Sequence, residues 1–134
     1  MGDTFKLEVA TPVALMVDED VTTAEIPGSK GYMGILPGHA PLLGMLAPGV
    51  LTYESAGQKH VLAVDSGFIE VLDDVVSVLT ENAQWSKDIK IDEARGQLSE
   101  AQKALAARPA EGANYEELVK AVSRAQAKVD ATGK

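Results

Sequence analysis

Cysteine is absent from this chain of 134 residues, so disulfides, zinc–thiolate sites and cysteine nucleophiles are excluded. Basic residues are also few: 12 lysines and arginines stand against 20 acids, and the formal net charge is −8. Because nucleic acids and anionic membrane surfaces attract basic proteins, this acidic balance argues against both as main partners.

Long apolar runs are missing as well. No stretch approaches the roughly 18 consecutive apolar residues of a membrane-spanning helix. The first residues, Met1-Gly2-Asp3-Thr4, lack the basic and apolar regions of a signal peptide, and none is expected. The apolar content of 46% is nonetheless sufficient for one packed domain, or for one domain with a small appendage.

The segment 26–43 concentrates residues that form turns. Pro27, Pro37 and Pro41 alternate there with glycines and apolar residues. Proline fixes φ and glycine permits positive φ, so this backbone is tightly specified. The segment contains no phosphate loop, metal-ligand spacing or nucleophile–base pair. A shaped but unreactive segment of this kind indicates a surface that another protein contacts.

Residues 4–82 show the pattern of short β-strands. Period-two alternation or β-branched runs occur at 4–9, 50–54, 60–64, 67–71 and 75–79, and turn signals separate the later ones. The acidic clusters Asp18-Glu19-Asp20 and Asp73-Asp74 are interpreted as solvated turns between strands rather than as metal sites. Many short strands without intervening helices predict an antiparallel sandwich or barrel.

After about Trp85 the hydrophobic period changes. Apolar residues recur every three or four positions, first at Ile91, Ala94, Leu98, Ala101 and Leu105, then at Tyr115, Leu118, Val122, Ala125 and Val129. With a break at 108–114 and Asn114 as a helix cap, this predicts two helices of about 16 residues in an antiparallel hairpin. Because the seams are rich in alanine, the hairpin should be weakly held; it is either a switch element or an ordinary hairpin docked on the sheet.

Few side chains suggest chemistry. His39 and His60 are the only histidines, and neither has a nucleophile at a catalytic spacing, so a structural or contact role is expected. Lys120, Arg124 and Lys128 form a basic stripe at four-residue spacing. Spacing alone favours a solvated face, supported by pairing of Glu116 with Lys120, over a docking face for an acidic partner.

Several motifs, taken in order, resemble one family. They are Pro27-Gly28-Ser29-x-Gly31-x-x-Gly34-Ile35, Pro37-Gly38-His39-Ala40-Pro41-Leu42-Leu43, Pro48-Gly49, Gly67-Phe68-Ile69-Glu70-Val71, Val78-Leu79-Thr80-Glu81-x-Ala83 and Ile91-Asp92-Glu93-Ala94-Arg95. With them the chain resembles the epsilon subunits of bacterial F-type ATP synthases, which are called delta in mitochondria. The resemblance extends from about Phe5 to Lys128.

The resemblance implies an α+β protein. An N-terminal antiparallel β-sandwich of about ten strands, residues 1–86, would bind the rotor and the gamma subunit; a C-terminal antiparallel two-helix hairpin, residues 87–134, would be regulatory. It implies a non-catalytic central-stalk subunit that couples proton flow through the c-subunit ring to ATP synthesis. The hairpin would inhibit ATP hydrolysis by extending to the alpha/beta head.

The same resemblance implies a peripheral position on the cytoplasmic face of the inner (plasma) membrane, without membrane insertion, and no nucleic-acid partner. No cofactor is expected to be required, and ATP is a candidate regulatory ligand. A freestanding β-sandwich binding module, with the hairpin as a docking arm for a soluble partner, is the alternative.

Candidate contact residues follow from the matching motifs. Contact with the rotor ring or gamma is expected at Gly28, Ser29, Lys30, Gly31, Tyr32, His39, Pro41 and Leu42. ATP would bind at Ile91, Asp92, Arg95 and Arg124, and the inhibitory contact would use Lys120, Arg124 and Lys128.

Two departures from the family pattern matter. Relatives often read Gly-Ser-Glu-Gly-Glu where this chain has Lys30 and Tyr32, so the ring contact loses two acids. Gly96 and Gln102 stand where the tightest ATP binders carry alanine and arginine, and losing a guanidinium removes a strong phosphate donor.

Overall fold

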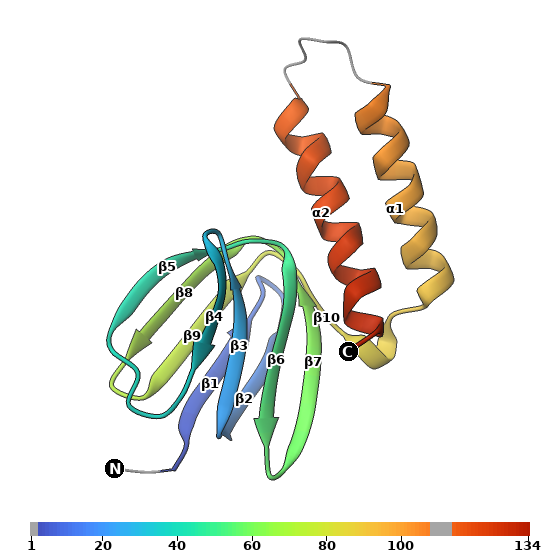
Figure 1. Ribbon diagram of the computed structural model, residues 1–134. Helices are drawn as coiled ribbons and strands as arrows, with labels where there is room; N and C mark the ends of the chain where they lie inside the picture. The colour runs from blue at the N-terminus through green and yellow to red at the C-terminus, as the bar shows by residue number, and fades with distance from the viewer. Residues whose placement is uncertain (1–2, 108–113) are drawn as a thin grey trace.

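The computed structural model describes residues 3–107 and 114–134, so all of the predicted break at 108–114 except Asn114 lies outside the described residues. Ten strands are followed by a short 3₁₀ turn and two helices (Figure 1). The strands are β1 (Phe5–Ala10), β2 (Leu15–Val21), β3 (Thr23–Gly28), β4 (Gly31–Ile35), β5 (Leu42–Leu46), β6 (Gly49–Ser55), β7 (Gln58–Val64), β8 (Gly67–Leu72), β9 (Val75–Thr80) and β10 (Ala83–Trp85). The 3₁₀ turn is η1 (Ser86–Asp88), and the helices are α1 (Ile91–Ala106) and α2 (Tyr115–Thr132).

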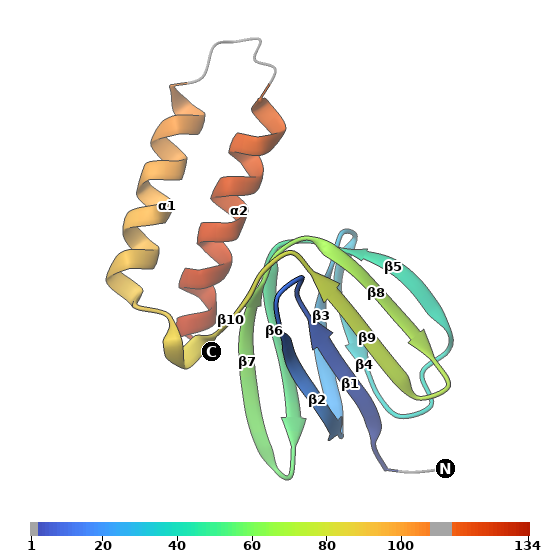
Figure 2. The ribbon, with the colours of Figure 1, turned by 180° about the vertical axis from the view of Figure 1, so that it is seen from behind.

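The strands form one strongly curled sheet, which makes a sandwich close to a barrel. Their order is β10-β7-β6-β3-β5-β8-β9-β1-β2, and β4 pairs with β3 outside this path. Curling brings β2 across from β6, as Figures 1 and 2 show from opposite sides. The expected fold class and strand number are confirmed. One detail of the prediction is wrong, because β1 pairs with β9 in parallel, with Lys6 opposite Val75.

The core follows from alternation along the strands. In β1, Phe5, Leu7 and Val9 are buried while Lys6 is exposed. The inner faces of the other strands complete one apolar cluster, whose largest members include Tyr53, Ile26, Leu51 and Ile69. The five strands predicted from sequence are confirmed, whereas β2, β3, β4, β5 and β10 were not predicted.

The interpretation of Asp18-Glu19-Asp20 as a turn is wrong, because these acids lie within β2. This edge strand buries Val17 and Val21 and exposes the acids between them. Glu19 accepts a hydrogen bond of 2.8 Å from the Tyr53 hydroxyl across the sandwich. Burial raises the pKa of the Tyr53 phenol above its ordinary value, and Glu19 raises it further.

Two turns depend on unusual backbone. Asp73 and Asp74 both have positive φ, 50° and 59°, which confirms the predicted turn; the Asp74 carboxylate accepts the Gly38 N–H at 2.7 Å. At the start of β8, a Cβ on Gly67 would lie 1.8 Å from the Leu79 carbonyl oxygen, so only glycine fits there.

The two predicted helices are confirmed as a hairpin beside the sandwich. Helix α2 packs against β6 and β7, and α1 packs on α2 (Figure 1). Asn114 occupies the position before α2, but its side chain makes no capping bond, because its φ of −110° and ψ of 20° are not the extended conformation that capping uses. Neither of the described helices is long and apolar enough to cross a membrane.

Candidate functional site

The predicted rotor or gamma contacts divide between the two ends of β5. Residues 28–32 form the β3–β4 hairpin turn and the start of β4, so the expected loop is largely a β-hairpin. This turn lies at the Leu46 end of β5, where the Ser29 N–H donates to the Met45 carbonyl at 2.9 Å. His39 precedes the other end of β5, and its Nδ1 lies 2.7 Å from the Ala40 carbonyl oxygen.

An open depression of about 500 Å³ separates the turn from β5. Its walls are residues 28–33 on one side and residues 42–45 on the other. Leu42 lines this depression together with Gly28, Ser29, Lys30, Gly31 and Tyr32, whereas His39, which precedes β5, does not. Pro41 is exposed just before this strand.

Tyr32 has a different position from its neighbours in the turn. Its hydroxyl accepts the Val50 N–H at 2.9 Å, although 55% of the residue is exposed. It also borders a second open depression, whose far wall is the end of α2 at Val129, Asp130 and Gly133. Tyr32 thus lies between the turn and the docked hairpin.

An apolar row crosses the outer face of the sheet. Met45, Phe68 and Leu79 lie directly opposite one another on β5, β8 and β9, and they are 60%, 56% and 58% exposed. The row continues through Ala10 on β1 to the exposed Leu15 on β2. We call these five residues the apolar stripe. Opposed residues on neighbouring strands share a face, so the stripe is continuous.

This surface is not among the contacts predicted from the sequence. The available signal was the presence of apolar residues on both faces of one strand: in β8, Phe68 and Leu72 point outward while Ile69 and Val71 are buried. Strands of this kind are typically covered on both sides. A contiguous exposed apolar patch indicates a protein contact.

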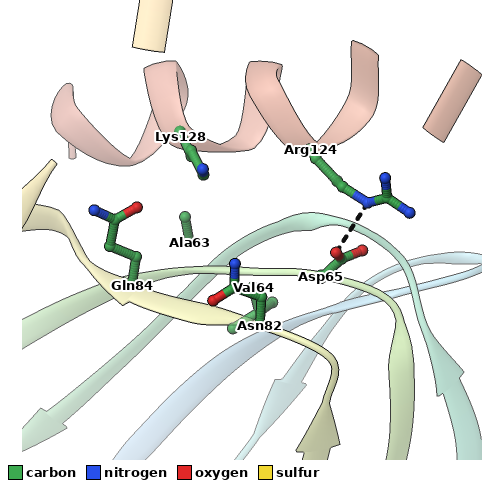
Figure 3. A pocket seen from close by; sticks show the side chains of 7 residues that line it. All are labelled: Ala63, Val64, Asp65, Asn82, Gln84, Arg124 and Lys128. Atoms are coloured by element: carbon green, nitrogen blue, oxygen red, sulfur yellow. Dashed lines mark ion pairs between the residues drawn. The ribbon is translucent and has the colours of Figure 1, made fainter. Parts of the chain in front are cut away.

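The basic stripe of α2 is not the solvated face that its spacing favoured. Of the three bases, only Lys120 is fully exposed and lies outside the contact between α2 and the sandwich. Among the described residues, Lys120 makes no ion pair with Glu116 or with any other acid. Lys128 is half-buried and lies 3.4 Å from the Gln97 side-chain oxygen of α1. Arg124 and Lys128 both line a small cavity beneath α2, together with Ala63, Val64, Asp65, Asn82 and Gln84 (Figure 3).

Arg124 points from α2 toward the β-sandwich (Figure 3). Its Nε lies 2.9 Å from Asp65 Oδ2, and the two side chains are 35% and 11% exposed. Asp65 follows β7, and its other carboxylate oxygen accepts the Ser66 N–H at 2.7 Å. The sequence pattern does not predict this contact, because an acid that follows an apolar strand carries no sign of its later partner.

The candidate ATP residues are not brought together in one place. Ile91 and Arg95 line an open cavity of about 630 Å³ between the start of α1 and the end of α2. Lys87 and Lys134 also line this cavity, and none of the described residues around it has an acidic side chain. Asp92 is exposed outside the lining, and Arg124 lines the separate cavity beneath α2. Three bases around one cavity favour an anionic ligand.

Comparisons of the sequence and of the structure with known proteins lead to the same family. Residues 4–86 match the family described as ATP synthase, Delta/Epsilon chain, beta-sandwich domain. The ATP synthase epsilon chain of Solibacter usitatus is 45% identical over 129 residues, which cover 96% of each chain. A chain in the Euglena gracilis mitochondrial ATP synthase structure (OSCP/F1/c-ring) has a TM-score of 0.85 at 26% identity, covering 100% of this chain and 84% of that one. The fold also matches a chain of the Tetrahymena thermophila mitochondrial ATP synthase central stalk/c-ring, with a TM-score of 0.68 at 13% identity and 95% of each chain covered.

Proposed function

The chain belongs to the ATP synthase delta/epsilon family, as a non-catalytic epsilon subunit of the central stalk, and from this premise we propose which surfaces it uses there. The β-sandwich joins the gamma subunit to the c-subunit ring, so that rotation driven by protons is transmitted to the catalytic head. The apolar stripe is the observation that carries this proposal, because a central-stalk subunit needs a permanent, water-excluding contact.

The stripe is proposed as the surface for gamma. Its residues Met45, Phe68 and Leu79 are large, neighbouring and exposed, on strands whose inner faces hold the core. Aromatic and aliphatic side chains at the centre of an interface supply most of its binding energy. His39 lies at the end of β5 beyond the stripe, within reach of the same partner.

The β3–β4 turn is proposed as the surface for the c ring. Lys30 is exposed at its tip, and the depression beside it offers Leu42 and Leu43 as apolar contacts. Since a lysine replaces an acid of the family pattern here, the polar loop of the ring should present an acceptor to it. The ring places the subunit peripherally at the cytoplasmic face of the membrane.

Cross-linking tests this placement. A cysteine introduced by Lys30→Cys should form a disulfide with cysteines placed in the polar loop of the c subunit, because the native chain has no competing thiol. The control is Lys59→Cys, in β7 next to the β6–β7 turn at the opposite end of the sandwich. If several turn positions fail to cross-link in an active complex, or if the control cross-links equally, the placement is wrong.

ATP is proposed as a weak regulatory ligand of the hairpin. Arg95, with Lys87 and Lys134, supplies positive charge around the cavity at the start of α1, whereas Gln102 lacks the guanidinium of tight binders. We expect a dissociation constant of about 1 mM or weaker. In calorimetry on the isolated subunit, Arg95→Ala should remove the heat of binding, while Arg124→Ala should reduce it less. Absence of heat from the native subunit at millimolar ATP would leave Ile91–Arg95 with a structural role alone.

A further inference from the structure

One ion pair joins the hairpin to the β-sandwich. Among the four ion pairs of the described residues, only Arg124–Asp65 spans the two parts; the others lie within the sandwich or within the C-terminal segment. The pair is partly shielded from water, with Asp65 nearly buried. Attraction between charges is stronger in such a position than on an open surface.

The remaining contact between the two parts is small. Ala131 of α2 meets Val50, Val61 and Ala63 of the sheet, with Ile89 beside them. Ala127 is also buried on α2. Because an alanine side chain removes little apolar area from water, this contact stabilises docking only modestly. The ion pair adds a charged contact to this apolar one, so its loss should weaken docking.

The two charges are held differently. The Asp65 carboxylate is oriented in advance, since Oδ1 accepts the Ser66 N–H and the Asp65 N–H donates to the Thr80 hydroxyl at 3.0 Å. Arg124 Nε is buried and close to Asp65 Oδ2, yet it has no acceptor in hydrogen-bond geometry. The contact is thus mainly coulombic, and an imperfectly satisfied donor limits how tightly it binds.

We propose that the Asp65 carboxylate competes with acidic residues of the catalytic head for Arg124. The carboxylate holds α2 against the sheet, and the hairpin extends only when this ion pair breaks. The proposal rests on the proposed function in one respect, because Arg124 is also a base expected to meet acidic residues of the catalytic head. Asp65 then sets the fraction of subunits whose hairpin is free to reach that head, and it acts as a positioning residue for α2.

The test measures docking in the complete isolated subunit. Cysteines introduced as a dye pair at Gln58 and Glu100, which are both exposed, report the distance between the sandwich and α1 by energy transfer. Asp65→Asn keeps the shape of the turn and removes the charge, and it should raise the ratio of undocked to docked molecules by about tenfold. Arg124→Gln, which leaves the turn untouched, should do the same.

The controls distinguish loss of the Arg124–Asp65 ion pair from general destabilisation of the subunit. The double variant Asp65→Asn/Arg124→Gln should show no further rise, because both changes remove one interaction. Arg124→Lys should restore part of the docking, since a coulombic contact tolerates another cation, and Lys120→Gln should have no effect. Salt should undock the native subunit but not the Asp65→Asn variant. Additive effects of the two substitutions, or an unchanged ratio in Asp65→Asn, would overturn the proposal.

A second readout separates this proposal from the proposed function. In the assembled head, Asp65→Asn should lower ATP hydrolysis, because more hairpins are free to inhibit. A docking shift without any change in hydrolysis would support the ion pair as a latch and contradict the inhibitory role of the hairpin. No shift and no change in hydrolysis would refute the latch.

Discussion

Replacing Phe68 with aspartate should detach this subunit from gamma, with a loss of affinity of at least about a hundredfold. Phe68 lies between Met45 and Leu79 and is the one aromatic residue of the apolar stripe. The change removes an aromatic contact and places an unpaired carboxylate in a water-excluding interface, where an unpaired charge is strongly unfavourable. Binding to purified gamma, measured by interferometry, should report the loss, and ATP synthesis should fall with it.

The folded subunit should survive this substitution, because the Phe68 side chain lies on the outer face and the core residues Ile69 and Val71 remain. The urea midpoint and the circular dichroism spectrum should be close to those of the native protein. The matched control is Val119→Asp, an exposed apolar position on α2 away from the stripe. Equal affinity for gamma in the native protein and the Phe68→Asp variant would show that the stripe faces something else.

Replacing Lys120, Arg124 and Lys128 together with alanine should raise ATP hydrolysis by the assembled head by roughly three- to tenfold. In the proposed function, extension of the hairpin exchanges its docking contacts, the Arg124–Asp65 ion pair and the apolar contact of α2, for charge pairs with an acidic crevice, and the substitutions remove those pairs. In the proposed function, ATP synthesis depends on the β-sandwich contacts, so it should remain largely intact. The assay is steady-state hydrolysis at low and high salt, and the gain should shrink at high salt because screening already weakens the native attraction.

Removal of the whole hairpin is the reference for this experiment. The truncated chain lacks residues 88–134 but keeps the complete main core. If truncation releases hydrolysis while the triple variant does not, the three bases take no part in inhibition. The opposite directions expected for the triple variant and for Asp65→Asn are informative, since the proposed roles of Arg124 are docking in one state and inhibition in the other.

The sequence predicted those parts of the fold that depend on local pattern. Alternation gave β1 and β6, β-branched runs gave β7, β8 and β9, and the 3.5-residue period gave both helices, because each pattern directly reflects which side chains can be buried. It missed β3 and β4 because Pro27, Gly28 and Gly31 conceal alternation at a tight hairpin. It misread the acids of β2 because an edge strand exposes residues that would otherwise signal a turn.

The candidate surfaces were less predictable, for a physical reason. The direction in which Arg124 points depends on how α2 docks, and no local pattern encodes that Asp65, 59 residues earlier in the chain, will be opposite it. The apolar stripe likewise depends on the register of five strands, which places Ala10 beside Leu79 and Met45 beside Phe68. Spacing predicts which residues share an element, whereas these contacts join separate elements.

The parallel pairing of β1 with β9 has a consequence for the order in which the chain folds. The first strand finds its neighbour about 70 positions later, since Lys6 lies opposite Val75, and β2 reaches the sheet only through β1. Contacts of such high sequence separation form slowly, because a long loop must close before they are gained. During synthesis, β1 and β2 can pair with each other early, but they can join the rest of the sheet only after β9 has been made. The C-terminal hairpin, built on local contacts, can then form last and quickly.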